Sequence, residues 1–115
     1  MRASRIQQAL YGGALALVWA LVLATTAASA ADTAAGRSKA VQCAACHGAN
    51  GMATLAEAPN LAGQNEIYLT KALHDFKSGT RKNETMSLMA ATLSDADIEN
   101  LAAYYHSIKI TVKEQ

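Results

Sequence analysis

The sequence lacks several patterns that would indicate other classes of protein. No segment alternates polar and apolar residues over the length of a strand, so we expect an all-α domain. No Ser/His/Asp set, phosphate-binding loop or pair of carboxylates stands out, so we expect neither an enzyme nor a substrate site. Only two cysteines and one proline are present among the 115 residues, which makes the setting of each one informative.

Long hydrophobic runs are also missing. The uncharged apolar segment of residues 9–24 is shorter than the roughly 20 residues that a bilayer span needs. It follows Arg2 and Arg5 and precedes Ala28-Ser29-Ala30, a small-residue pattern typical of signal-peptidase sites. We therefore predict a secretory signal peptide over residues 1–30, cleaved after Ala30, and one domain over residues 31–115 in the periplasm. A permanent membrane anchor is the alternative.

The charge of the predicted mature domain is nearly balanced. Residues 31–115 contain eight Lys and Arg against nine Asp and Glu, a formal net charge of −1. Nucleic acid is therefore not an expected partner. A domain of this size buries only a modest core, and such domains often depend on a metal, a disulfide or a cofactor.

The two cysteines stand together in Cys43-Ala44-Ala45-Cys46-His47. Cys-x-x-Cys-His is the attachment signature of a c-type haem. Two thiols one helical turn apart can each add to a vinyl group of one porphyrin, and the next histidine then lies under the ring. We predict one covalent haem c on Cys43 and Cys46, with His47 as the proximal axial ligand of its iron.

Three other interpretations of this motif are weaker. A thioredoxin-type redox pair needs a βαβ setting, which the sequence does not predict. A zinc site would have to be completed by His74 and His106 at unsuitable spacing, and both are expected to face solvent. A structural disulfide across so short a loop would contribute little stability.

Helix signals predict three main helices. The first runs from Asp32 to Ala44, and the second runs from about Glu66 to Ser78, where Gly79 stops it. The third begins at Ser94, with Asp97 completing a capping box and a hydrophobic staple from Leu93 to Ile98. Residues 48–64 are predicted as a loop, and residues 80–92 as a segment that is first polar and then methionine-rich.

The mature sequence resembles a class I c-type cytochrome of the small bacterial single-haem kind, and it is also similar to one lobe of the tandem two-haem cytochromes. The similarity covers most of residues 31–109 and includes the strings CAACHGANG, APNLAGQNEIYLTKALHDFKSGTRKN, MSLMAATLSDADI and LAAYY. It implies a cytochrome c fold, with three main helices and loops wrapped around one covalently bound haem. It also implies that Gly36 and Tyr104 pack where the first and last helices cross.

A haem held by histidine alone has an open face, which a methionine thioether would close while raising the reduction potential. Met52 lies only five residues after His47, too close to reach the opposite face, whereas Met86 and Met89 both lie between the second and last helices. In the resembling family the ligand stands seven residues before the position of Leu93. This selects Met86 as the distal ligand, with Met89 as the runner-up.

Two further residues are expected to support the haem. The resemblance implies that the backbone carbonyl of Pro59 accepts a hydrogen bond from the imidazole of His47, a bond that fixes the ring and tunes its basicity. A plain turn proline is the alternative. Arg81 is the candidate partner of a haem propionate. It belongs to a basic cluster expected to be a solvated face, although the cluster could also steer docking to an acidic redox partner; its members are Lys71, Lys77, Arg81 and Lys82.

The resemblance implies a periplasmic electron carrier that exchanges single electrons with transient donor and acceptor proteins, the membrane serving only as the site of partner complexes. A cytochrome subunit of a larger periplasmic oxidoreductase is one alternative. A haem protein with an open distal site, acting as a sensor or an enzyme, is the other, and it requires that Met86 not bind iron.

Overall fold

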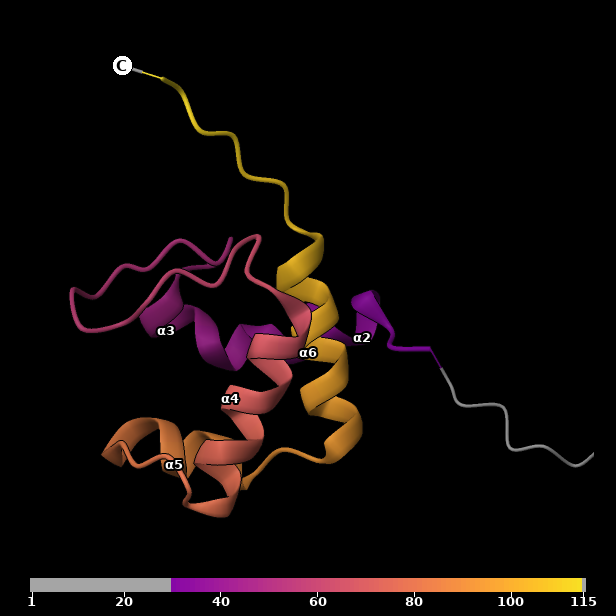
Figure 1. Ribbon diagram of the computed structural model, residues 1–115, viewed down its shortest axis with the longest axis vertical. Helices are drawn as coiled ribbons and strands as arrows, with labels where there is room; N and C mark the ends of the chain where they lie inside the picture. The colour runs from indigo at the N-terminus through magenta and orange to yellow at the C-terminus, as the bar shows by residue number, and fades with distance from the viewer. Residues whose placement is uncertain (1–29, 115) are drawn as a thin grey trace, which may run out of the picture.

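A computed structural model describes residues 30–114, and the predicted signal peptide, apart from Ala30, lies outside this range. Every regular element in the described part is helical, which confirms the all-α prediction. In chain order the elements are α2 (Thr33–Lys39), the 3₁₀ helix η1 (Ala40–Cys43), α3 (Ala44–His47), α4 (Glu66–Ser78), α5 (Glu84–Ala91) and α6 (Asp95–Ser107) (Figure 1). In residues 30–114 no helix combines the length and the apolarity needed to span a bilayer.

The predicted first helix is divided into three short helical pieces. Asp32 caps α2, its carboxylate accepting hydrogen bonds from the backbone N–H groups of Ala34 and Ala35. At Ala40 the backbone tightens into η1, which leads directly into α3. The helical path therefore reaches His47, three residues beyond the predicted end at Ala44.

The second helix begins and ends at its predicted boundaries, and the last helix begins where it was predicted to begin. Gly79 ends α4 in the left-handed region, at φ 80°, where a residue without a Cβ pays no steric penalty. Ser94 caps α6 and forms a full capping box with Asp97. Leu93 and Ile98, the predicted staple, are 5% and 0% exposed and belong to the core.

A further helix, α5, occupies the methionine-rich segment, to which the sequence analysis assigned no helix. Asn83 caps it, because its side-chain oxygen accepts a hydrogen bond from the N–H of Met86 at 2.9 Å. Glu84 follows in the first turn, where a negative charge is favourable. These cap signals were present in the sequence, but only Ala90 of this helix is buried, so it shows no continuous apolar stripe.

The first and last helices cross at very short range. An ideal Cβ built on Gly36 would lie 2.0 Å from the backbone oxygen of Asn100 and 2.8 Å from Cβ of Tyr104. This confirms the expected packing of Gly36 against Tyr104. The crossing fixes the N-terminal helix on the C-terminal one, and the backbone N–H of Asp32 donates to the side-chain oxygen of Asn100 at 2.7 Å.

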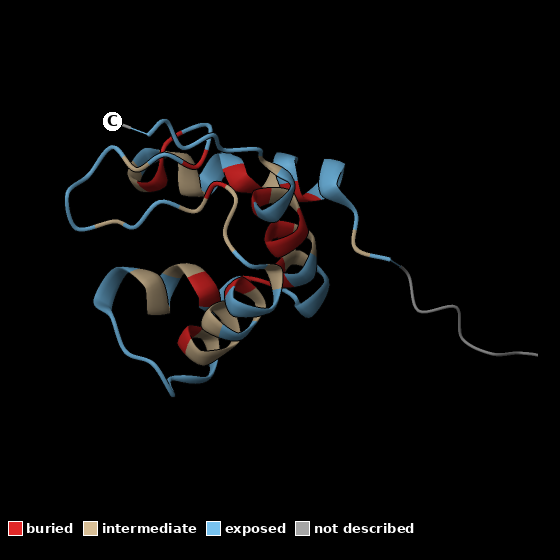
Figure 2. Ribbon diagram, turned by 45° about the horizontal axis from the view of Figure 1, so that its top comes forward, coloured by how far each residue is buried: buried red, intermediate tan, exposed pale blue. Residues whose placement is uncertain are grey.

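The core lies where α2, η1, α4 and α6 meet, and most of its buried residues come from α6 (Figure 2). Its members are Ala40, Leu69, Leu93, Ile98, Leu101, Ala102 and Tyr105. Helix α4 packs against both α5 and α6. In Figures 1 and 2, α3 and α5 project from the same side of the α4–α6 pair and lie on opposite sides of the space between them.

Candidate haem site

Both cysteines of the motif are free thiols, and both are half-buried. Cys43 ends η1 and packs against the core cluster, while Cys46 lies within α3. Burial raises the pKa of the Cys43 thiol; a hydrogen bond with Tyr105 opposes this shift, and the nearby Cys46 adds to it. Burial also raises the pKa of Tyr105, which keeps its hydroxyl protonated. The two sulfurs thus stand one helical turn apart on the continuous path of η1 and α3, which is the spacing of the attachment motif.

His47, the last residue of α3, is 6% exposed. Its Nδ1 lies 2.8 Å from the backbone oxygen of Pro59. Because a carbonyl can only accept, Nδ1 carries the proton and donates it to this bond. Nε2 is therefore left with its lone pair, which is the state in which an imidazole binds a metal.

The loop after His47 is folded back on α3 by two glycines. Gly48 has φ 78°, and a Cβ at this position would lie 1.8 Å from the backbone oxygen of Met52. Gly51 also has φ 78°, and its oxygen accepts hydrogen bonds from the N–H groups of Leu61 and Ala62. Only glycine fits such a path, so the loop returns at once to the helix that carries the cysteines.

Two residues that the sequence did not single out as functional hold this loop in place. Thr54 donates its hydroxyl hydrogen to the backbone oxygens of Ala45 at 3.0 Å and Cys46 at 3.3 Å, sharing it between the last carbonyls of α3. The side-chain oxygen of Asn60 accepts from the N–H of Ala53 at 2.7 Å. Asn60 stood out in the sequence only as a turn residue, and no local signal marked Thr54.

The far end of the loop is tied to α6. The N–H of Gly63 donates to the oxygen of Tyr105 at 2.8 Å, and Nδ1–H of His106 donates to the oxygen of Gln64 at 2.9 Å. His106 is exposed, as expected. His74, by contrast, is half-buried on α4. Across the described residues, no three His, Cys, Asp or Glu side chains come together as a metal-binding group.

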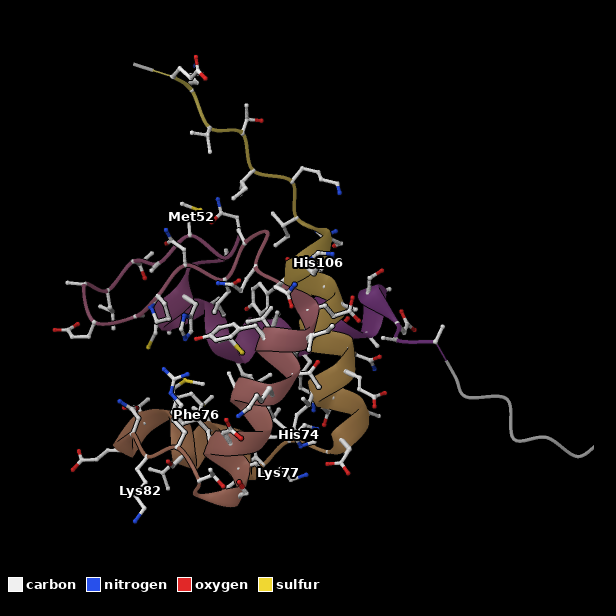
Figure 3. All side chains as sticks on the ribbon, in the orientation of Figure 1. Met52, His74, Phe76, Lys77, Lys82 and His106 are labelled. Carbon is white, nitrogen blue, oxygen red and sulfur yellow. The ribbon has the colours of Figure 1, made fainter. Side chains whose placement is uncertain are left out.

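The two methionines of α5 stand three residues apart and therefore share one face of that helix. Met86 and Met89 are both half-buried. Figure 3 shows sulfur atoms in the space between α3 and α5. Met52 is 45% exposed in the loop that follows α3, and the figure places it on the outer side of that loop.

Arg81 does not stand free in solvent. Its guanidinium lies 4.6 Å from the centre of the Phe76 ring, and its backbone N–H donates to the backbone oxygen of Asp75 at 2.9 Å. Two other members of the predicted basic cluster form ion pairs, Lys77 with Asp95 at 2.8 Å and Lys71 with Asp75. The exposed Lys82 is at the far end of the molecule in Figure 3. The cluster is thus partly neutralised within the chain.

These residues fit a covalently attached haem. The described residues supply two thiols one helical turn apart, an imidazole whose Nδ1 is bonded to Pro59 so that Nε2 keeps its lone pair, and a methionine-bearing helix, α5. A helical domain with this arrangement defines a c-type haem protein. The family model for cytochrome c matches residues 33–109, and the chain belongs to this family.

Relatives of known kind agree with this assignment. Cytochrome c4 from Pseudomonas aeruginosa is 44% identical over 98 residues, which cover 85% of this chain and 49% of that protein. The thiosulfate dehydrogenase electron acceptor of Thiomonas intermedia is 46% identical over 83 residues, covering 71% of this chain and 38% of that protein. The crystal structure of reduced recombinant cytochrome c4 from Pseudomonas stutzeri superposes with a TM-score of 0.67 at 42% identity, covering 72% of this chain and 48% of that one.

The fold is therefore the cytochrome c fold, and the cofactor of the family is covalently bound haem c. The chain spans about half the length of the cytochrome c4 relatives that it matches.

Proposed function

We propose that this chain is a periplasmic electron carrier whose single haem c has histidine and methionine as axial ligands. The observation that carries the proposal is the bond from Nδ1 of His47 to the oxygen of Pro59. It holds the imidazole in the tautomer that presents Nε2 next to the two thiols. An imidazole held in this tautomer is ready to bind a metal at Nε2.

Four side chains would hold the cofactor. Cys43 and Cys46 form the thioether bonds, His47 gives the proximal nitrogen and Met86 gives the distal sulfur. Haem iron supplies reversible one-electron chemistry, and a histidine–methionine pair favours a high potential. With both axial positions filled by the protein, no site is left for a substrate, so the proposal includes no catalysed reaction.

Met86 is preferred to Met89 because of its family spacing from Leu93. Its place in α5 supports the choice. Met86 is the third residue of α5. Because helical side chains lean toward the N-terminus of their helix, its thioether points past the N-terminal end of α5. Arg81, two residues before Asn83, remains the proposed propionate partner.

Arg81 lies in the short connection between Gly79, which ends α4, and Asn83, which caps α5. Its guanidinium is exposed on one side and rests on the ring of the buried Phe76 on the other. A cation held in this way keeps its hydrogen-bond donors free for a carboxylate. This supports the proposed contact with a haem propionate.

The location and the partners rest on separate observations. The Ala28-Ser29-Ala30 pattern supports export and cleavage, with Ala31 as the first mature residue. The relative from Thiomonas intermedia is named an electron acceptor, which supports exchange of electrons with donor and acceptor proteins here. The near-neutral charge of the mature domain supports protein partners rather than nucleic acid.

The visible spectrum of the purified exported protein tests the proposal. We expect covalent haem that survives denaturing electrophoresis, a low-spin spectrum in both oxidation states, and the long-wavelength sulfur-to-iron band in the oxidised protein. Rapid binding of carbon monoxide by the reduced protein, together with absence of that band, would replace the carrier with a sensor or enzyme. Sequencing the mature N-terminus tests cleavage, since an intact Met1 would indicate an anchor.

A second candidate function is that of a cytochrome subunit in a larger oxidoreductase. It is supported by the match to about half of each cytochrome c4 relative, whose chains are about twice as long as the matched region. The native mass of the exported protein separates the two functions. A haem-loaded monomer supports the free carrier, whereas co-purification in a stoichiometric complex supports the subunit.

A further inference from the structure

We propose that Thr54 and Asn60 are positioning residues for the proximal ligand, acting through a closed circuit of hydrogen bonds that holds the carbonyl of Pro59 on His47. The inference rests on the proposed function, because it concerns the ligand that faces the iron. Neither side chain touches His47, and each acts through the backbone of the loop.

The circuit has three links. Nδ1–H of His47 donates to the oxygen of Pro59 at 2.8 Å. The side-chain oxygen of the next residue, Asn60, accepts from the N–H of Ala53 at 2.7 Å. Thr54, which follows Ala53, donates its hydroxyl to the last carbonyls of α3, that of Cys46 among them.

Each link ends beside the residue where the next one begins. Pro59 precedes Asn60, Ala53 precedes Thr54, and Cys46 precedes His47. The circuit therefore closes on the ligand itself. A displacement of the loop cannot lengthen one bond without straining the other two, so the Pro59 oxygen is held at a fixed distance from the imidazole.

The circuit is separate from the closure at the base of the loop. That closure consists of the bonds from Leu61 and Ala62 to the oxygen of Gly51. The backbone N–H of Thr54 also donates to the oxygen of Cys46 at 3.0 Å. Removal of the Thr54 hydroxyl therefore weakens the link between Thr54 and Cys46 without breaking it, and the loop stays closed.

A looser bond to Pro59 has a defined chemical effect. The acceptor oxygen makes the imidazole a stronger electron donor at Nε2, and such donation stabilises oxidised iron more than reduced iron. Weakening the bond therefore raises the reduction potential. It also exposes the Nδ1 proton of His47 to exchange with solvent.

The first test replaces Thr54 in the haem-loaded protein and follows the His47 Nδ1 proton of the reduced state by NMR. Thr54→Val removes the hydroxyl at nearly constant volume, and Thr54→Ser keeps it. A side-chain hydrogen bond of ordinary strength corresponds to an exchange rate that rises about 2- to 10-fold when the bond is lost. We expect this rise, with a higher reduction potential, in Thr54→Val, and wild-type values in Thr54→Ser.

The second test breaks the other link and combines the two. Asn60→Leu removes the acceptor, and Asn60→Asp keeps an oxygen at that position. Because the links act in series, we expect the double variant Thr54→Val/Asn60→Leu to change exchange and potential little more than either single variant. Two independent contributions would instead multiply the changes in exchange rate.

Ser38→Ala is the matched control, since it removes a hydroxyl-to-carbonyl bond of 3.1 Å within α2, outside the loop. It should leave the exchange rate and the potential unchanged.

The inference is overturned if Ser38→Ala shifts both as strongly as Thr54→Val, or if Thr54→Val and Asn60→Leu both match the wild type. If Thr54→Val does not fold, Asn60→Leu decides alone. Wild-type protein without covalent haem overturns the proposed function and this inference with it, whereas normal haem attachment with unchanged exchange overturns the inference alone.

Discussion

The backbone of Gly36 lies so close to the carbonyl of Asn100 that a side chain at position 36 would meet the Asn100 oxygen at 2.0 Å. Residues 64 positions apart in the sequence are thereby brought into contact at the crossing of α2 and α6. The atom in the way belongs to the backbone of a packed helix, so it cannot move aside as a flexible side chain would.

Gly36→Ala should therefore destabilise the protein by about 1–3 kcal/mol, the usual cost of overpacking. Denaturant unfolding followed by circular dichroism measures the change. Arg37→Ala, at an exposed position of the same helix, should stay within about 0.5 kcal/mol of the wild type. A Gly36→Ala variant as stable as the wild type would show that the two helices separate easily.

Leu101 is 1% exposed at the centre of α6, and Leu101→Ala should lower the free energy of unfolding by about 2–5 kcal/mol. The loss combines the missing transfer free energy with the cavity left behind. Leu88→Ala removes the same atoms from a side chain that is 74% exposed, so it should have little effect. Equal losses at the two positions would contradict the described core.

The two methionines of α5 can be separated by paired variants. Met86→Ala should abolish the sulfur-to-iron band of the oxidised protein and allow the reduced protein to bind carbon monoxide. Met89→Ala should keep the band and remain closed to carbon monoxide. The reverse pattern would identify Met89 as the distal ligand. Both variants should keep the covalent haem, because neither touches the thioether bonds.

Acid should destabilise the protein partly through Asp97. The bond from the backbone N–H of Ser94 holds the pKa of this carboxyl below its usual value, and the ion pair with Lys39 adds to the effect. A lowered native pKa contributes stability above the unfolded value of about 3.9, and this stability is lost as the pH falls through that value toward the native one.

Asp97→Asn should therefore flatten the fall in unfolding free energy below about pH 4, a range set by the ordinary pKa of aspartate. Denaturant unfolding at a series of pH values measures the slope. Glu99→Gln removes the same charge from the same helix and serves as the control. A slope unchanged by Asp97→Asn would assign the acid sensitivity to other groups.

The sequence predicted those parts of the fold that depend on local signals. The apolar spacing from Leu69 to Phe76 with the stop at Gly79 predicted α4, and the Ser94 cap predicted the start of α6. Helix α5 was missed because its burial depends on α4 rather than on a stripe of its own. The loop circuit could not be predicted from the sequence. The Thr54 hydroxyl reaches the backbone oxygen of Ala45 only because Gly48 and Gly51 turn the chain back.

The hydrogen bonds that join Asp32 and Gly63 to α6 also set the order in which the structure can form. The N–H of Asp32 bonds to Asn100, and the loop that carries Pro59 is fastened through Gly63 to Tyr105. Since a chain emerges from the ribosome with its N-terminus first, these contacts cannot form until Asn100 and Tyr105 have been made. The thiols of Cys43 and Cys46 thus leave the ribosome before the core against which Cys43 packs can form, and during that interval the attachment motif is still an open peptide.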